Sequence, residues 1–300
     1  MYDILIIGGG PAGLTAAVYA RRGGKSVLVL EKESFGGQIA QSPRVENYPG
    51  FLSVSGTELA DRLLEQAMES GAETELEEAC SIERTESGWN VLCASGAVFA
   101  GRSVILAVGA KPRPLGLPRE EALTGNGISY CAVCDGAFYR DRDVAVVGGG
   151  STALQDALLL SETSHRVWLI HRRGSFRGER KLLDALQKRE NVTILTDTVI
   201  TELLGGDALN GLMIEQNGQA RRLSLEGLFI AVGSQPDTAP FAEQLPLDAS
   251  GCVAAGEDCQ TGLPGLFAAG DCRRKSVRQL TTAVADGAVS ALAALHDMES

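Results

Sequence analysis

Apolar and polar positions follow the same order in two separate stretches of the chain. Residues 4 to 31 form an apolar run, a glycine-rich turn, a helical pattern and a second apolar run, written ILIIGGGPAG, LTAAVYARRGG and KSVLVLE. Residues 143 to 173 repeat this order as DVAVVGGGSTA, LQDALLLSETS and HRVWLIHRR. When Gly8 is aligned with Gly148, Glu31 and His171 both fall at the end of the second apolar run. The pattern predicts two βαβ units.

The continuation of each unit predicts that one domain is inserted into the other. Each unit is followed by a strand that ends in Ala-Val-Gly, at 104 to 109 and at 228 to 233. Proline-bearing segments at 110 to 118 and 233 to 240 come next, and we interpret them as linkers because proline disfavours helices and central strands. The apolar run at 262 to 271 and a helix from about Arg278 to the end then complete the first unit.

We therefore predict an α/β fold with two Rossmann-like nucleotide-binding domains of three-layer ββα architecture. The outer, discontinuous domain comprises residues 1–112 and 241–300, and the inserted domain comprises residues 113–240. Paired strands near 111 to 116 and 235 to 240 join the two domains and form a natural hinge.

The first glycine turn has the GxGxxG spacing of a dinucleotide site in Gly8, Gly10 and Gly13. Such a turn places free amide groups and the positive end of a helix against a pyrophosphate, although many glycine turns merely connect elements. Glu31, at the end of the next strand, can accept hydrogen bonds from a ribose hydroxyl and would repel a 2′-phosphate. The outer domain is thus expected to bind FAD or NAD.

The second turn has the related GxGxxA form in Gly148, Gly150 and Ala153. In place of the acidic residue the chain has His171-Arg172-Arg173, and Arg177 follows one helical turn later. The planar donor fork of arginine matches phosphate oxygens, which suits the 2′-phosphate of NADPH. The alternative is a solvated basic run at the end of a strand. Two different dinucleotides are therefore expected, FAD in the outer domain and NADPH in the inserted one.

Cys131 and Cys134 form the only close pair among the seven cysteines. Half of a zinc site and two buried thiols are the alternatives, but no second CxxC is present and the three histidines are scattered, so we predict no metal site. The spacing favours a redox-active dithiol that closes a small, readily opened ring. Asp135 follows directly. It is either a common turn residue or a carboxyl group that supplies or takes the proton of the dithiol reaction.

Composition and charge limit the partners of this 300-residue chain. A net charge of −11 disfavours nucleic acid and anionic membrane surfaces as partners, because both require a basic face. We see neither a signal peptide nor a membrane-spanning segment, and we expect a cytoplasmic protein whose other cysteines are free thiols.

The complete set of motifs closely resembles the low-molecular-weight thioredoxin reductases along essentially the whole chain. The matching segments are GGGPAG (8 to 13), GGQ (36 to 38), VENYPGF (45 to 51), SYCAVCDG (129 to 136), GGGSTA (148 to 153), HRRGSFR (171 to 177), FAAGD (267 to 271) and RQL (278 to 280). The resemblance implies an NADPH-dependent thioredoxin-disulfide reductase that carries FAD, forms a homodimer and takes thioredoxin or a thioredoxin-like protein as its partner. It also implies that the NADPH domain rotates between half-reactions.

The resemblance further assigns roles to individual residues. Cys134 contacts the flavin, Cys131 attacks thioredoxin, and Asp135 is the proton donor. Gln38 and Asn47 lie along the flavin, Asp271 holds its ribityl or pyrophosphate part, and residues 278 to 280 border the isoalloxazine. The predicted FAD site comprises Gly8, Gly10, Pro11, Ala12, Gly13, Glu31, Lys32, Gly37, Gln38, Asn47, Ala107, Gly109, Gly270, Asp271, Arg278, Gln279 and Leu280. The predicted NADPH site comprises Gly149, Gly150, Ser151, Thr152, His171, Arg172, Arg173, Arg177 and Gly233.

Two features, one pair of residues and one single residue, depart from the family pattern. Gln155-Asp156 replaces two glutamates after the second glycine turn, which bears on a contact to the nicotinamide, and Cys272 follows Asp271 as a small buried side chain without a redox role.

Four other functions remain to be weighed. A ferredoxin-dependent flavin thioredoxin reductase and a flavin dithiol oxidase would not need the arginine cluster. A nucleotide-binding redox sensor would not turn over, and a nicotinamide–ferredoxin reductase would lack the cysteine pair.

Overall fold

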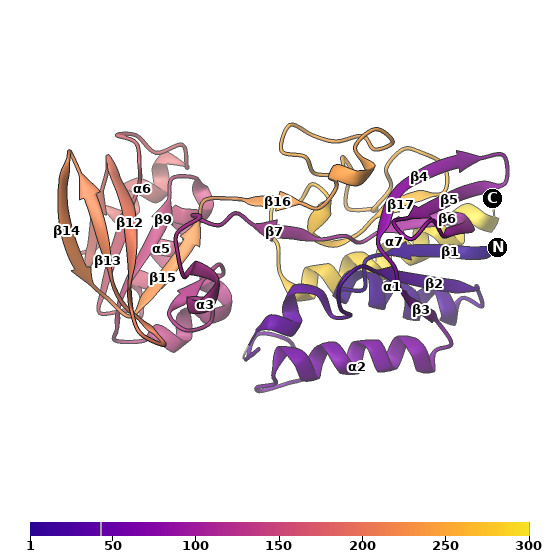
Figure 1. The fold of residues 1–300 in the computed structure, drawn as a ribbon, viewed down its shortest axis with the longest axis horizontal. Coiled ribbons are helices and arrows are strands. Elements are labelled where there is room, and N and C mark those ends of the chain that lie inside the picture. The colour runs from indigo at the N-terminus through magenta and orange to yellow at the C-terminus, as the bar shows by residue number, and fades with distance from the viewer. Residues whose placement is uncertain (43, 300) are drawn as a thin grey trace. The chain divides into compact units, whose positions relative to one another are not determined.

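The computed structural model describes residues 1–42 and 44–299 and divides into two compact units (Figure 1). The first unit is Met1–Lys111 with Gln235–Ser300, and the second unit is Pro112–Ser234. The return to the first unit thus begins at Gln235 and not at 241, because the intervening residues bond to the first unit. Asp237 forms an ion pair with Lys32, and Thr238 Oγ1 donates to the carbonyl oxygen of Gly251 at 2.7 Å.

The first unit is built on a seven-stranded sheet with the order β3-β2-β1-β6-β5-β4, in which β17 also pairs with β6. Its strands are β1 (Tyr2–Ile7), β2 (Val27–Glu31), β3 (Glu73–Leu76), β4 (Ala79–Thr85), β5 (Gly88–Cys93), β6 (Val98–Leu106) and β17 (Leu266–Ala268). Strands β1, β2, β3, β6 and β17 pair in parallel, whereas β4 and β5 add an antiparallel extension to the start of β6. The long strand β6 therefore belongs to both parts.

Helices cover one face of this sheet, and the antiparallel strands and loops lie over the other. The helices on this face are α1 (Pro11–Arg22), α2 (Gly56–Glu69) and α7 (Leu280–Glu299). The unit also has the short 3-10 helices η1 (Gly37–Gln41), η3 (Ala239–Phe241) and η4 (Gly270–Cys272), of which η3 packs through Phe241 on the other face. Side chains of a strand alternate between its faces, so Ile4 and Ile6 pack with α1 and α7 while Leu5 and Ile7 pack with Trp89 of β5. This alternation gives two cores and three layers.

The second unit repeats the plan around a five-stranded, all-parallel sheet with the order β11-β10-β9-β15-β8. Its elements are α3 (Glu120–Leu123), β8 (Ile128–Ser129), α4 (Ala132–Asp135), η2 (Gly136–Tyr139), β9 (Asp143–Gly148), α5 (Ser151–Ser161), β10 (Arg166–Ile170), α6 (Arg180–Leu186), β11 (Val192–Leu195), β12 (Thr198–Gly205), β13 (Leu209–Gln216), β14 (Gln219–Ser224) and β15 (Gly227–Ala231). Val144 and Val146 pack under α5, whereas Ala145 faces the antiparallel sheet β12-β13-β14. This unit too has three layers.

The two linkers pair as predicted, but over a short length. Strand β7 (Ala110–Pro112) pairs with β16 (Ser234–Pro236) in a sheet of only these two strands. Within the described ranges, none of the helices combines the length and apolar character of a bilayer span.

Candidate active site: two glycine turns and a disulfide

The first glycine turn lies between the end of β1 and the start of α1, and its glycines are required by close packing. Gly8 has a φ of +108°, and a Cβ there would collide with the carbonyl oxygen of Ala107. A Cβ at Gly13 would collide with the carbonyl oxygen of Gly8, whereas no atom crowds Gly10 closely. Pro11 fixes the first helical position. The turn thus keeps its backbone open at the N-terminus of α1.

Glu31 is held at this turn by backbone hydrogen bonds. Its carboxylate accepts the N–H of Gly9 at 2.7 Å and the N–H of Glu33 at 3.0 Å. A carboxylate has about four acceptor positions, so the oxygens can accept ribose hydroxyls as well.

Two other predicted segments converge on the same turn. A Cβ at Gly37 would lie 3.2 Å from the Cα of Gly10, and a Cβ at Gly270 would lie 3.0 Å from the Cβ of Ala12. Elements η1 and η4 therefore reach the turn from distant parts of the sequence.

Two buried polar atoms near this turn have the character that a polar ligand requires. Among the described residues, Asp271 Oδ1 and Arg278 Nε are buried and have no hydrogen-bond partner. Burial raises the pKa of Asp271, and the cations Lys275 and Arg278 oppose that rise. A hydroxyl group could donate to Asp271 Oδ1, and a pyrophosphate oxygen could accept from Arg278 Nε. FAD contains both groups, so these residues fit FAD.

The remaining residues of the predicted FAD site bond among themselves or to the nearby chain. Asn47 Nδ2 donates to Gln279 Oε1 at 3.4 Å, and Gln38 donates to the carbonyl oxygen of Ala110. The carbonyl oxygen of Gly109 accepts the N–H of Asp237 at 3.2 Å. Leu280, by contrast, packs in a separate apolar cluster.

The ring of His171 packs against the second glycine turn at Gly149 and leaves Gly150 free. A Cβ at Gly149 would collide with this ring, which is 6% exposed and stacks on Phe176 with centroids 4.9 Å apart. His171 Nε2 lies 3.1 Å from the carbonyl oxygen of Ser175. Burial, followed by the neighbouring arginines, lowers the pKa of His171. The ring thus packs against the turn as a neutral group.

Three arginines beside this turn carry the exposed positive charge. Arg172, Arg173 and Arg177 are exposed, and none of them forms an ion pair with a carboxylate of residues 1–42 or 44–299. The N–H of Arg177 donates to the carbonyl oxygen of Gly149 at 2.8 Å, which fixes this arginine next to the turn. A phosphate is the partner that such a cluster fits.

The start of α5 and Gly233 complete the predicted NADPH site. Gly150 begins α5 with nothing close to its Cβ position, and Thr152 is exposed. Ser151 Oγ accepts the N–H of Glu179 at 3.2 Å, and the carbonyl oxygen of Gly233 accepts the N–H of Arg113 at 2.9 Å. The open turn and the adjacent arginines fit an adenosine 2′-phosphate.

Cys131 and Cys134 form a disulfide at the start of the single helical turn α4. Cys131 is the N-cap residue of α4, and its Sγ accepts the N–H of Cys134 at 3.2 Å. Both cysteines are partly exposed, and Val133 between them is 56% exposed. The disulfide is therefore accessible to a reagent or a protein.

Asp135 is held beside the disulfide by a residue that sequence reasoning missed. Ser129 Oγ donates to Asp135 Oδ2 at 2.6 Å and accepts the N–H of Cys131 at 3.0 Å. Burial raises the pKa of Asp135, and the hydrogen bond from Ser129 opposes that rise. The only signal in the sequence is a serine two residues before the first cysteine. The carboxyl group can hold a proton close to the sulfur atoms.

Both departures from the family pattern have a structural description. Burial raises the pKa of Asp156, on α5, to about 6. Burial likewise raises the pKa of Cys272 to about 12, and its Sγ donates to the carbonyl oxygen of Ala269 at 3.3 Å. Cys272 is thus a buried thiol, as expected.

Comparison with known proteins adds to this geometry. A family model described as pyridine nucleotide-disulphide oxidoreductase matches residues 2–287. A thioredoxin reductase of Mycolicibacterium smegmatis is 40% identical over 296 residues, which are 97% of this chain and 95% of the relative. A bifunctional thioredoxin reductase/thioredoxin of Mycobacterium leprae is 37% identical and covers 97% of this chain and 65% of the relative. The crystal structure of a thioredoxin reductase from Streptococcus pyogenes has a TM-score of 0.93 at 40% identity and covers 100% of this chain and 98% of that chain.

Proposed function

Because the chain belongs to the pyridine nucleotide-disulphide oxidoreductase family, we propose that it uses NADPH to reduce the disulfide of an oxidised thioredoxin. The observation that carries the proposal is the Cys131–Cys134 disulfide, with a half-buried carboxyl group beside it, in the same unit as the arginine-flanked glycine turn. The M. leprae relative, whose name combines the reductase with thioredoxin, supports thioredoxin as the substrate.

The residues of the first unit hold FAD, which supplies two-electron transfer between NADPH and the disulfide when bound. Gly10 would leave room for the pyrophosphate, Gly8 and Gly13 let the backbone of the turn pack closely, and Glu31 would accept ribose hydroxyls. Asp271 would accept a ribityl hydroxyl through its unpartnered oxygen.

The cysteines of the second unit carry the electrons to the substrate. Two electrons break the Cys131–Cys134 bond and leave two sulfur atoms, of which one receives its proton from Asp135. The Cys131 thiolate attacks the thioredoxin disulfide and forms a mixed disulfide, which Cys134 resolves. In total, one NADPH and one proton are consumed for each disulfide converted to two thiols.

The arginines of the second unit select the nicotinamide cofactor. Arg172, Arg173 and Arg177 bind the 2′-phosphate, because their exposed guanidinium groups have no carboxylate partner within the described residues. A ferredoxin-dependent reductase or a dithiol oxidase would have no use for this cluster, so both alternatives are disfavoured.

Both half-reactions need the same flavin. One flavin face cannot accept a hydride from NADPH and contact the disulfide at the same time. We therefore propose that the second unit rotates about the paired strands β7 and β16 between half-reactions.

We also propose a cytoplasmic homodimer. The homodimer rests on the resemblance to the reductases, and light scattering of the purified protein tests it. The cytoplasm rests on the five cysteines that remain free thiols, Cys80, Cys93, Cys252, Cys259 and Cys272.

The first experiment mixes the purified yellow protein with NADPH in the absence of oxygen, follows flavin absorbance, and then adds oxidised thioredoxin. We expect NADPH to bleach the flavin and oxidised thioredoxin to restore its absorbance. The restoration should be lost in Cys134→Ser. Flavin that stays oxidised with NADPH but is bleached by reduced ferredoxin would replace the proposal with the ferredoxin-linked reductase. Bleaching without sustained NADPH consumption would favour a sensor.

A further inference from the structure

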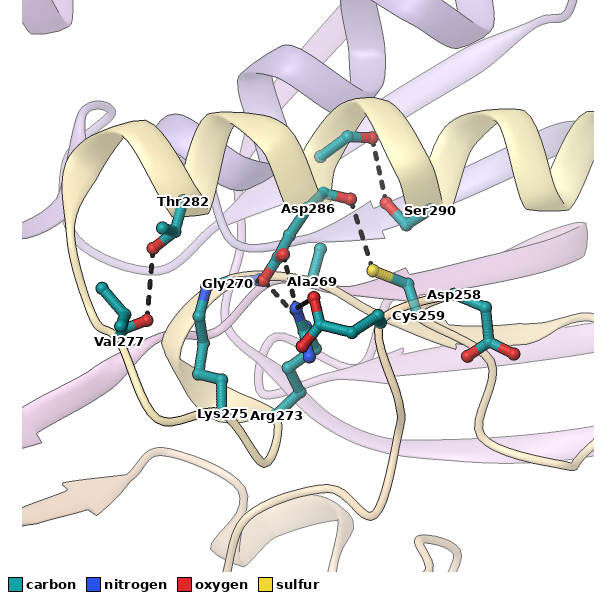
Figure 2. Close-up of polar contacts among 12 residues, drawn as sticks. Asp258, Cys259, Ala269, Gly270, Arg273, Lys275, Val277, Thr282, Asp286 and Ser290 are labelled. Carbon is teal, nitrogen blue, oxygen red and sulfur yellow. Dashed lines mark hydrogen bonds and ion pairs between the residues drawn. The ribbon is translucent and has the colours of Figure 1, made fainter.

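Helix α7 carries a buried carboxylate that ties down the turn next to the glycine-rich site (Figure 2). Asp286 is 5% exposed, and its Oδ2 accepts the backbone N–H of Gly270 at 3.0 Å. The same oxygen accepts Arg273 Nε and Lys275 Nζ, each at 2.8 Å, and Oδ1 accepts Arg273 Nη2 at 2.7 Å. One side chain therefore holds three positions of the segment 270 to 275.

The cluster is charged and almost dry. The side chains of Arg273 and Lys275 are 2% and 5% exposed. Burial alone would raise the pKa of Asp286, but the hydrogen bonds from Arg273 and Lys275 hold it below its usual value, so the carboxylate is ionised. Glu257 approaches Arg273 at 3.5 Å but is 93% exposed and contributes little. Two buried cations thus surround one buried anion.

This arrangement bears directly on Asp271, which lies within the tied segment. On one side, Gly270 packs against Ala12 of the first glycine turn, and on the other its N–H is held by Asp286. Asp271 follows immediately and has a buried oxygen without a partner among the described residues. Lys275 also favours the ionised form of Asp271. A change at Asp286 would therefore alter both the position and the charge of Asp271.

We propose that Asp286 is a positioning residue for FAD, which acts by fixing the segment from Gly270 to Lys275 so that Asp271 presents its free oxygen to the cofactor. The inference rests on the proposed function, since it takes FAD as the ligand of this turn. The carboxylate of Asp286 is used by four hydrogen bonds from Gly270, Arg273 and Lys275 of that segment. Its effect on the cofactor is indirect.

The test measures FAD dissociation from the purified holoprotein by the recovery of free-flavin fluorescence on dilution. Circular dichroism of the same samples shows whether the protein is folded. The variants are Asp286→Asn, which removes the charge that pairs with two cations, and Lys275→Met, which removes one cation and leaves the Arg273 pair intact. Asp297→Asn is the matched control, because Asp297 is exposed on the same helix and undergoes the same change of charge.

We expect the dissociation constant for FAD to rise at least about tenfold in Asp286→Asn and about three- to tenfold in Lys275→Met, as charge-assisted hydrogen bonds are lost. The control should stay within about twofold of the parent protein. If Asp286→Asn does not fold, Lys275→Met decides the question. Folded variants that keep the parent affinity would overturn the inference, whereas a parent protein that binds no FAD would contradict the proposed function instead.

Discussion

Two carboxyl groups of the second unit, Asp135 and Asp156, lie where burial disfavours their charge. Only Asp135 has a hydroxyl partner whose hydrogen bond opposes the rise in its pKa. The two residues therefore differ in what a substitution should do. Asp135 affects the pH dependence of the reaction, and Asp156 affects the pH dependence of stability.

Ser129→Ala should move the alkaline limb of the pH profile for thioredoxin reduction to higher pH. The substitution removes the hydrogen bond that lowers the pKa of Asp135, so the carboxyl group keeps its proton to higher pH. Steady-state kcat against pH measures this. Ser161→Ala is the control, because its hydroxyl donates to the carbonyl oxygen of Leu158 at 2.6 Å and not to a carboxyl group. If the alkaline limb of Ser129→Ala lies at the same pH as that of the parent protein, Asp135 is not the proton donor.

Asp156→Asn should stabilise the second unit at about pH 8, and the gain should disappear near pH 4. The pKa of Asp156 is about 6 in the folded protein against 3.8 as its ordinary value, so between these values the folded state binds more protons. Stability therefore falls as pH rises through this window, and above it the ionised carboxylate costs up to about 3 kcal/mol.

Urea unfolding at several pH values measures this difference. In a Trp89→Phe background the fluorescence of Trp168 reports on the second unit, because the remaining tryptophan lies in its core. Glu190→Gln, an exposed change of the same charge, should give no such pH dependence. An equal stability of Asp156→Asn and the parent at every pH would refute the effect of burial.

At the level of elements, the buried side chain of Glu120 holds the segment by which the chain enters the second unit. Glu120, 5% exposed at the start of α3, accepts the backbone N–H groups of Leu115, Gly116 and Leu117 at 2.8 to 3.1 Å. It also accepts the hydroxyl of Tyr130 at 2.8 Å, one residue before the disulfide. Glu120 thus bonds both to the loop that follows β7 and to the segment that leads to α4.

Glu120→Gln should destabilise the second unit by about 2 to 4 kcal/mol, because the new amide group faces backbone donors and leaves at least one of them unsatisfied. Tyr130→Phe, which removes only one hydrogen bond, should cost about 1 kcal/mol. The same fluorescence assay measures both. Glu121→Gln is the control, since Glu121 is exposed on the same turn. If Glu120→Gln and Glu121→Gln change the free energy of unfolding equally, the hydrogen bonds of Glu120 do not stabilise the second unit.

The sequence predicted the elements that have a local pattern and missed those that depend on distant contacts. The two βαβ units, the paired linkers and the C-terminal helix follow from runs and turns that can be seen in a short window. By contrast, the pairing of Asp286 with Arg273, and that of Glu120 with Tyr130, brings polar side chains together only in the folded chain. Ser129 lies close to Asp135 in sequence, but nothing in the pattern gives the orientation of its hydroxyl.

At the scale of the whole molecule, the two units divide the chemistry between them. The first unit contains the turn that fits FAD, and the second unit contains both the arginine-flanked turn and the disulfide. If NADPH binds the arginine-flanked turn as proposed, its hydride leaves the second unit for FAD, and the electrons return to the second unit when the flavin reduces the disulfide. The protein partner then meets the cysteines and not the cofactor, so the roles of the two sulfur atoms can be separated chemically.

Cys134→Ser should trap thioredoxin on the enzyme, and Cys131→Ser should not. If Cys131 attacks the substrate and Cys134 resolves the mixed disulfide, then removing Cys134 leaves the covalent complex with no intramolecular thiol to cleave it. The partner is a thioredoxin variant that lacks its own resolving cysteine and is activated as a mixed disulfide with a small thiol. Both enzyme variants are made in a Cys80→Ser background, because Cys80 is the exposed one among the five free cysteines and could react by itself. Non-reducing electrophoresis and intact mass should show a one-to-one adduct only when Cys131 is present. An adduct formed mainly through Cys134 would reverse the assignment of the two cysteines but keep the disulfide as the redox centre.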